Sequence, residues 1–198
     1  MKLYHGTNFS SAINIVNNGI DLGFSKPYLD FGAGFYTTPS YDHAAVSAIR
    51  ATQKYNARHN TCEEPYIVEV EFKPMKKKEL VTVSYPRHSD KWGKFVLNNR
   101  LTSNILSTYN IIEHNQDAKY DVCIGEIADG SIANIVYKVN NGIIKPEDVN
   151  YSDFLKDNGE VYSQQYSFHT LKAISCINVL SCGIITNKQK YLKSIGRR

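Results

Sequence analysis

Residues Asp30 to Thr38 read Asp-Phe-Gly-Ala-Gly-Phe-Tyr-Thr-Thr, a turn loosened by two glycines that leads into aromatic and β-branched residues. Such side chains favour strands. Pro39 follows, and proline has no backbone N–H to offer a strand ladder. The pattern predicts a short strand that begins near Phe35 and ends before Pro39.

Further helices and strands are predicted on both sides of this segment. Serine caps, glycine stops and a first-turn proline predict five helices, over about residues 10–19, 40–58, 89–99, 131–141 and 146–156. Alternating or continuous apolar runs predict strands, over about residues 2–7, 66–72, 80–83, 120–128, 161–169 and 176–185. The strands at 66–72 and 80–83 are expected to pair through the region of Lys76.

Composition predicts one folded domain over residues 1–198, with a basic tail at about 186–198. The chain has 198 residues, 42% of them apolar and 12% aromatic, and a net charge of +4. A chain of this size buries roughly 70% of the surface that its unfolded form exposes. No apolar run approaches the roughly 18 residues of a membrane span, and residues 1–7 lack the features of a secretory signal. We therefore expect a cytoplasmic protein with no membrane partner.

The cysteines and the basic clusters carry no strong functional signal. The four cysteines lack the paired spacing of a zinc site and are expected to be free thiols: Cys62, Cys123, Cys176 and Cys182. No metal is expected. The two basic clusters, residues 73–78 and 188–198, are interpreted as solvated surface, although a basic tail could contact nucleic acid.

Several common enzyme classes are excluded by missing motifs. No phosphate-binding loop ending in Gly-Lys-Ser/Thr occurs, and Gly32-Ala33-Gly34 lacks the third glycine and the helix of a dinucleotide fingerprint. Neither a Gly-x-Ser-x-Gly elbow nor a His-x-x-x-His pair is present. P-loop, Rossmann, serine-hydrolase and zincin interpretations therefore fail.

Three segments, taken in order, match a known pattern. They are Tyr4-His5-Gly6-Thr7, then Gly32 to Thr38, then Gln165-Tyr166-Ser167-Phe168-His169-Thr170. Together they resemble the ADP-ribosyltransferase superfamily, specifically its His-Tyr-Glu branch, which is like diphtheria toxin and the poly-ADP-ribose polymerases. The sequence is similar to a group of bacterial and phage domains of unknown function within that superfamily. The resemblance extends over roughly residues 3–173.

The resemblance implies an α+β fold, with a split β-sandwich core and flanking helices around a cleft for NAD. It implies His5, Tyr36 and Gln165 as the catalytic residues. His5 would donate to the adenine-ribose hydroxyl, and Tyr36 would stack on the nicotinamide ring, with Phe35 or Tyr28 closing the other side. The residues implied to bind NAD are His5, Gly6, Thr7, Phe35, Tyr36 and Thr37.

The third catalytic position departs from the family pattern, because Gln165 stands where glutamate is common. Glutamine can hydrogen-bond the ribose 2′-hydroxyl, but it carries no charge and cannot act as a general base. Gln164 is the alternative third residue, and Glu160 or Glu126 could compensate. His169 is expected to be structural.

The expected activity is mono-ADP-ribosyl transfer from NAD to a protein or nucleic acid, with release of nicotinamide. NAD hydrolysis and an inactive nucleotide-binding or nucleic-acid-binding module on the same fold remain the alternatives. If the chain is toxin-like, an antitoxin or inhibitor protein is an expected partner.

Overall fold

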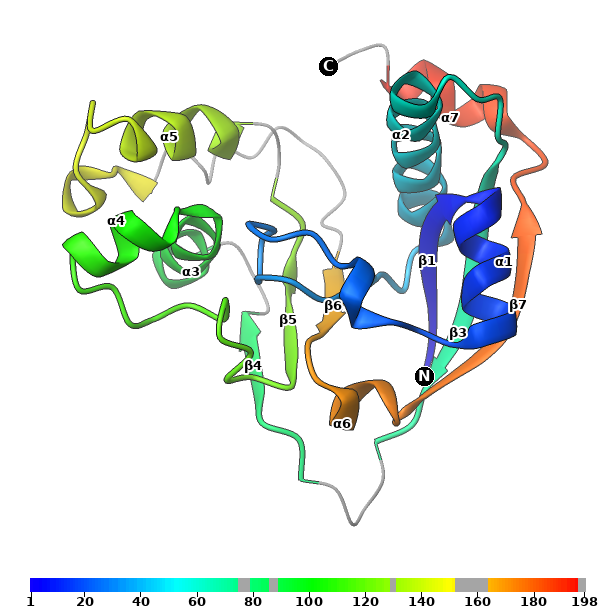
Figure 1. The fold of residues 1–198 in the computed structure, drawn as a ribbon, viewed down its shortest axis with the longest axis horizontal. Helices are drawn as coiled ribbons and strands as arrows, with labels where there is room; N and C mark the ends of the chain where they lie inside the picture. Colours follow the sequence, from blue (N-terminus) through cyan, green and yellow to red (C-terminus); the bar gives the residue numbers. More distant parts are fainter. Residues whose placement is uncertain (75–78, 86–88, 129–130, 152–163, 196–198) are drawn as a thin grey trace. The chain divides into compact units, whose positions relative to one another are not determined.

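A computed structural model describes residues 1–74, 79–85, 89–128, 131–151 and 164–195, and it has an α+β fold with two sheets (Figure 1). The chain divides into two compact units built from interleaved segments. Unit 1 comprises residues 1–21, 36–79 and 172–198, and unit 2 comprises residues 22–35 and 80–171. The predicted α+β class is confirmed. The split sandwich, its cleft and the single domain stay predictions.

Unit 1 is built on a three-stranded antiparallel sheet in the order β1-β3-β7. Its elements are β1 (Lys2–Asn8), α1 (Phe9–Asn18), α2 (Tyr41–His59), β3 (Pro65–Phe72), β7 (Ile177–Ile184) and α7 (Lys188–Ile195). Helix α2 packs on β1 and β3, and α1 packs on β3 and β7. The short helix α6 (Leu171–Ile174) crosses the boundary between the units.

Unit 2 contains most of the second sheet, whose strand order is β2-β6-β5-β4. Its elements are η1 (Leu22–Phe24), β4 (Thr82–Tyr85), α3 (Asp90–Arg100), α4 (Ser103–Thr108), β5 (Val122–Glu126), α5 (Ser131–Asn140), η2 (Pro146–Asp148) and β6 (Gln164–Phe168). The boundary between the units falls inside β2 (Phe35–Thr37), after Phe35. Buried aromatic rings of α3 form much of the core, with Phe95 lying 5.1 Å from Tyr85 and 6.0 Å from Phe31 between ring centroids.

Local signals located most of these elements correctly. Ser40 Oγ accepts from the His43 amide at the start of α2, and Ser89 Oγ accepts from the Trp92 amide at the start of α3, as predicted. Gly19 and Gly142 follow α1 and α5 with positive φ, which is the expected conformation of a helix stop. Helix α1 differs at its start, because Asn8 is the N-cap residue and Ser10 instead hydrogen-bonds Glu63.

Two predictions about the middle of the chain were wrong. Strands β3 and β4 do not pair with each other, because β1 and β7 occupy both edges of β3, whereas β4 pairs in parallel with β5. In the described part of the helix predicted at residues 146–156, only the 3₁₀ turn η2 forms at the predicted start, and Val149 after it is extended. Residues 152–163 lie outside the described residues.

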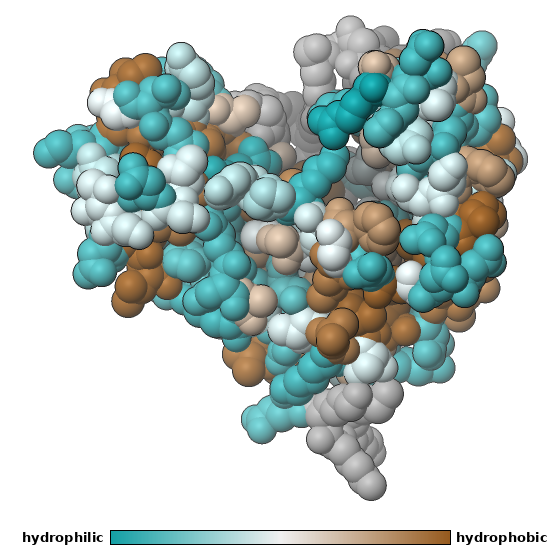
Figure 2. Space-filling model, viewed as in Figure 1, coloured by the Kyte–Doolittle hydropathy of each residue, from teal (hydrophilic) through white to brown (hydrophobic). Residues whose placement is uncertain are grey.

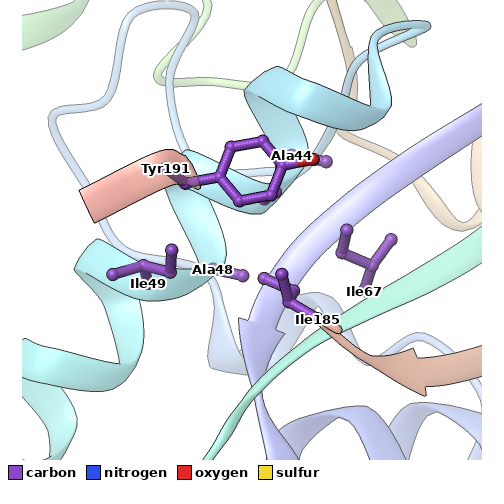
Figure 3. Packing of buried hydrophobic residues seen from close by; sticks show 7 residues of the cluster. Ala44, Ala48, Ile49, Ile67, Ile185 and Tyr191 are labelled. Atoms are coloured by element: carbon purple, nitrogen blue, oxygen red, sulfur yellow. The ribbon is translucent and has the colours of Figure 1, made fainter. Parts of the chain in front are cut away.

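The C-terminal basic segment is a helix packed on α2 rather than a freely solvated tail. Tyr191 of α7 is buried and belongs to the core of unit 1 (Figure 3). Its hydroxyl donates to Asp42 at 2.8 Å, and Lys190 pairs with the same carboxylate at 3.1 Å. Of the basic cluster at residues 73–78, Lys73 pairs with Glu71, and residues 75–78 lie outside the described part.

On the face drawn in Figure 2, hydrophilic residues cover much of the surface, and hydrophobic residues gather in several patches between them. Among the described helices, none combines the length and the apolar character that crossing a bilayer requires. All four cysteines are free, and Cys123 and Cys176 are buried.

The closest packing in unit 1 is between Gly6 of β1 and the backbone of α2. A Cβ atom added at Gly6 would lie 2.0 Å from the Ala44 carbonyl oxygen and 2.6 Å from the Ala48 nitrogen. Small residues line this side of α2, since Ala44, Ala45 and Ala48 are all buried. Gly6 and these alanines let the helix lie directly on the strand, which accounts for a glycine at this position.

We expect Gly6→Ala to lower the free energy of unfolding by about 1–3 kcal/mol or more, because the added methyl group collides with helix backbone that cannot rotate away. Urea unfolding followed by circular dichroism measures the change. Gly183→Ala in β7 is the matched control, since its added Cβ meets no atom within 4 Å, and it should shift stability by less than about 1 kcal/mol. Equal effects of the two substitutions would contradict the packing argument.

Candidate active site

The three catalytic residues implied by the sequence belong to different units. His5 and Tyr36 lie in unit 1, and Gln165 lies in unit 2.

In unit 1, β1 meets the segment that follows the glycine turn. Tyr4 and Thr38 exchange two backbone hydrogen bonds of 2.8 and 2.9 Å, which form a single antiparallel bridge. One residue further along β1, His5 Nδ1 lies 2.7 Å from the Tyr36 carbonyl oxygen. The structure therefore brings His5 and Tyr36 together through the imidazole ring of one and the backbone of the other.

The hydrogen bond to Tyr36 fixes the tautomer of His5. A carbonyl oxygen can only accept, so Nδ1 carries the proton. Burial lowers the pKa of His5 below its ordinary value, although the Tyr36 carbonyl opposes this shift. The ring is therefore mostly neutral at pH 7, and the lone pair of Nε2 gives that atom the capacity to accept a hydrogen bond.

The other residues predicted to bind NAD in unit 1 are largely buried. Thr7 is buried and its hydroxyl donates to Asn8 Oδ1, and Thr37 is buried as well. Gly6 and Tyr36 are half-buried. Contacts of these residues with NAD stay predictions.

In unit 2, Gln165 belongs to a buried polar network. Its Nε2 donates to Asp30 Oδ2 at 2.8 Å and to the Glu126 carbonyl oxygen at 3.1 Å. The Asp30 carboxylate also forms an ion pair with Arg100, whose Nε lies 2.8 Å from Oδ1. Gln165 is 6% exposed and Asp30 is 7% exposed.

The structure distinguishes Gln165 from the alternative third residues. Gln164 is its neighbour in β6, so the two side chains point to opposite sides of the strand, and Gln164 Oε1 accepts from the Tyr166 hydroxyl. Glu126 is buried and contacts Gln165 through its backbone carbonyl. Glu160 lies outside the described residues. Of these residues, only Gln165 has an amide that the described hydrogen bonds orient toward Asp30.

Phe35 and Tyr28 differ in how far they are available for stacking. Phe35 is buried in unit 2, whereas Tyr28 is 44% exposed and has a φ of 59°. Whether either ring closes over nicotinamide stays a prediction.

His169 has the structural role expected from the sequence. Its Nδ1 lies 2.7 Å from the Ala33 carbonyl oxygen, and its Nε2 lies 2.8 Å from Ser167 Oγ. Its backbone amide donates to the Asp121 carbonyl oxygen. His169 thus ties the glycine turn to the end of β6, and burial lowers its pKa.

Sequence reasoning missed Asp30 and Arg100. Asp30 belongs to the Asp-Phe-Gly-Ala-Gly segment quoted above, but the sequence assigns it no role of its own, and no motif includes Arg100. A carboxylate directly before the buried Phe31 could have indicated a buried partner. Arg100 lies 70 residues away in the sequence, so no local pattern joins the two.

Within the described residues, no group of three or more histidine, cysteine, aspartate or glutamate side chains is placed to hold a metal ion.

Comparison with known families shows that residues 1–179 match the family described as "Protein of unknown function (DUF3990)". The chain belongs to this family. No curated protein and no solved structure matches it.

We expect the free energy of unfolding to fall as the pH drops below about 6.5, the ordinary pKa of histidine. The unfolded chain then takes up protons at His169 and His5, whose folded-state pKa values are lowered. Each such proton gives a slope of up to about 1.4 kcal/mol per pH unit. Above about pH 7.5 the unfolded histidines are mostly neutral, so these two residues contribute little pH dependence there.

Urea unfolding at about pH 7.5 and about pH 5.5, on either side of the ordinary histidine pKa, measures this dependence. His169→Gln, which does not titrate, should lose less stability between the two pH values than the wild type does. An equal loss in both proteins would contradict the assignment of this pH dependence to His169.

Proposed function

We propose that the chain is an NAD-dependent ADP-ribosyltransferase, which transfers ADP-ribose from NAD to a protein or nucleic acid and releases nicotinamide. The observation that carries the proposal is that Gly6 directs its backbone N–H and C=O to the edge of β1 next to Tyr36. The resemblance of the three sequence segments supports the same activity.

Gly6 offers a backbone donor and acceptor side by side on that edge. Residues of an antiparallel strand alternate between bonding to one neighbour and to the other. Tyr4 bonds to Thr38, so the N–H and C=O of Gly6, two residues on, also point away from β3. No hydrogen bond joins these two groups to any described residue. A primary carboxamide such as that of nicotinamide has one acceptor and one NH₂ donor, which complement this pair.

His5 and Tyr36 flank this edge with groups suited to the rest of the nicotinamide riboside and the adenine ribose. The Tyr36 ring would stack on nicotinamide. The neutral His5 would accept from an adenine-ribose hydroxyl at Nε2, because its proton at Nδ1 is bonded to the Tyr36 carbonyl oxygen. This reverses the direction expected from the sequence, in which His5 was the donor.

Gln165 would act on the reacting ribose. Breaking the bond between C1′ and the nicotinamide nitrogen leaves its electron pair on nicotinamide and positive charge on the ribose. A nucleophilic oxygen or nitrogen of the acceptor then supplies the new electron pair to C1′, and the proton that it loses passes to water. A side-chain oxygen bonded to the 2′-hydroxyl stabilises that charge as it develops.

The proposal predicts that purified protein incubated with NAD releases nicotinamide, which liquid chromatography detects. His5→Ala and Tyr36→Ala should each lower the rate about a hundredfold or more, because NAD loses its orientation. The exposed residues His59 and Tyr137 provide matched controls, and His59→Ala and Tyr137→Ala should keep the wild-type rate.

The products distinguish the alternatives. ADP-ribose found by mass spectrometry on protein or nucleic acid from a cell extract supports transfer. Release of nicotinamide with only free ADP-ribose indicates an NAD glycohydrolase instead. Binding of NAD without release of nicotinamide indicates an inactive binding module and contradicts the enzymatic proposal.

A further inference from the structure

Asp30 is a buried carboxylate whose hydrogen-bonding sites are occupied by donors from three parts of unit 2. Arg100 of α3 binds Oδ1, while Gln165 Nε2 and the Ala128 backbone N–H bind Oδ2 at 2.8 and 3.2 Å. A buried carboxylate is stable only with such compensation. The Arg100 guanidinium, which is always protonated, supplies the opposite charge.

The packing of Phe31 holds Asp30 beside Gln165. Phe31 is fully buried, and a Cβ added at Gly125 would lie 2.8 Å from its ring. Gly125 is also the cross-strand partner of Gln165 between β5 and β6. The absence of a side chain at Gly125 lets the Phe31 ring approach the sheet at this register, and Asp30 precedes Phe31 in the chain.

The orientation of the Gln165 amide follows from its two partners. A carboxylate oxygen and a backbone carbonyl oxygen both accept, so the group that faces them must be the NH₂. The amide oxygen, Oε1, therefore points away from Asp30. Oε1 has no hydrogen-bond partner among the described residues. It is also absent from the fully buried, unpartnered side-chain atoms of the described residues, so it keeps some contact with solvent.

We propose that Asp30 is a positioning residue that turns the Gln165 amide so that Oε1 accepts from the ribose 2′-hydroxyl of the substrate. The inference rests on the proposed function and adds a second residue to the third catalytic position. A donor bonded to a carboxylate also makes the amide oxygen more negative. Asp30 thereby acts on the substrate only by orienting and polarising the Gln165 amide, and it exchanges no proton with the substrate.

The contact with Asp30 also explains why position 165 holds glutamine rather than glutamate. A glutamate there would set two carboxylates at hydrogen-bond distance, with Arg100 facing Asp30 alone. Like charges so close disfavour ionisation of both groups. The amide pairs with the carboxylate without that repulsion.

Steady-state release of nicotinamide tests the inference with Asp30→Asn, Gln165→Glu and the double variant. Each single substitution should lower kcat about tenfold or more, with the KM for NAD changed less than about threefold, because the contact acts mainly on the transition state. In the double variant the introduced amide can donate to the introduced carboxylate, which removes the repulsion between two carboxylates. The Glu126 carbonyl oxygen still faces position 165 and the Ala128 N–H still faces position 30, so the recovery is partial, and kcat should rise above that of the slower single variant. Asp117→Asn and Gln53→Glu, both at exposed positions, are matched controls and should not change kcat.

The pH profile separates orientation from a merely structural role. The activity of Gln165→Glu, relative to wild type, should rise as the pH is lowered from about 8. At lower pH the introduced carboxyl group takes up a proton, and a protonated carboxyl at position 165 can donate to Asp30 as the amide does. A double variant no faster than the slower single variant, or Asp30→Asn with wild-type kcat, would overturn the inference. Equal relative loss at every pH in Gln165→Glu would also overturn it.

A readout independent of activity keeps the two proposals distinguishable. In a ¹⁵N–¹H spectrum the side-chain NH₂ signal that disappears in Gln165→Glu belongs to Gln165, and it should shift in Asp30→Asn but not in Asp117→Asn. If the wild type releases no nicotinamide while this shift occurs, the proposed function fails and the orientation by Asp30 stands. Absence of the shift refutes the orientation whatever the activity.

Discussion

The buried carboxylate of Asp30 is the constraint around which unit 2 is organised. An ionised carboxylate removed from water costs several kcal/mol unless opposite charge and hydrogen-bond donors replace the water. Arg100 at the end of α3 supplies the charge, and Gln165 on β6 and the backbone after β5 supply donors. Three elements distant in sequence are thereby held in one geometry. Removal of any one partner leaves a polar group without compensation inside the unit.

Unit 1 depends on close packing rather than on charge. Helix α2 lies so near β1 that Gly6 has no room for a Cβ, and the facing residues of α2 are alanines. The same glycine has its backbone N–H and C=O directed along the open edge. The absence of a side chain at Gly6 therefore accommodates helix α2. The backbone N–H and C=O of the same residue lie on the side of Tyr36, where the proposed carboxamide contact would form.

Local chemistry made much of the fold predictable. Ser40, Ser89, Gly19 and Gly142 act within a few residues of themselves, so the helices that they start or end were found from the sequence. Pairing is different, because the partner of a strand depends on distant segments. The pattern of residues 66–72 indicated a strand but contained nothing to show that β1 and β7 would occupy both its edges.

The candidate site follows the same division. His5, Tyr36 and Gln165 could be singled out as candidates because each lies in a recognisable short motif. The tautomer of His5 and the orientation of the Gln165 amide were not predictable, because each depends on a contact with a residue 31 or 135 positions away. Tyr191 was likewise unpredictable as core, since a basic segment with a single tyrosine has the composition of a solvated tail.

The position of α7 has a consequence for how this family is delimited. The matched residues end at 179, within β7, yet Ile185 and Tyr191 beyond that point complete the core of unit 1. A chain shortened to the matched residues would leave the first half of β3 as a bare strand edge beside uncovered apolar side chains of α2. Bare edges and apolar patches of this kind promote self-association. For this protein the folding unit therefore extends further along the chain than the region of sequence similarity.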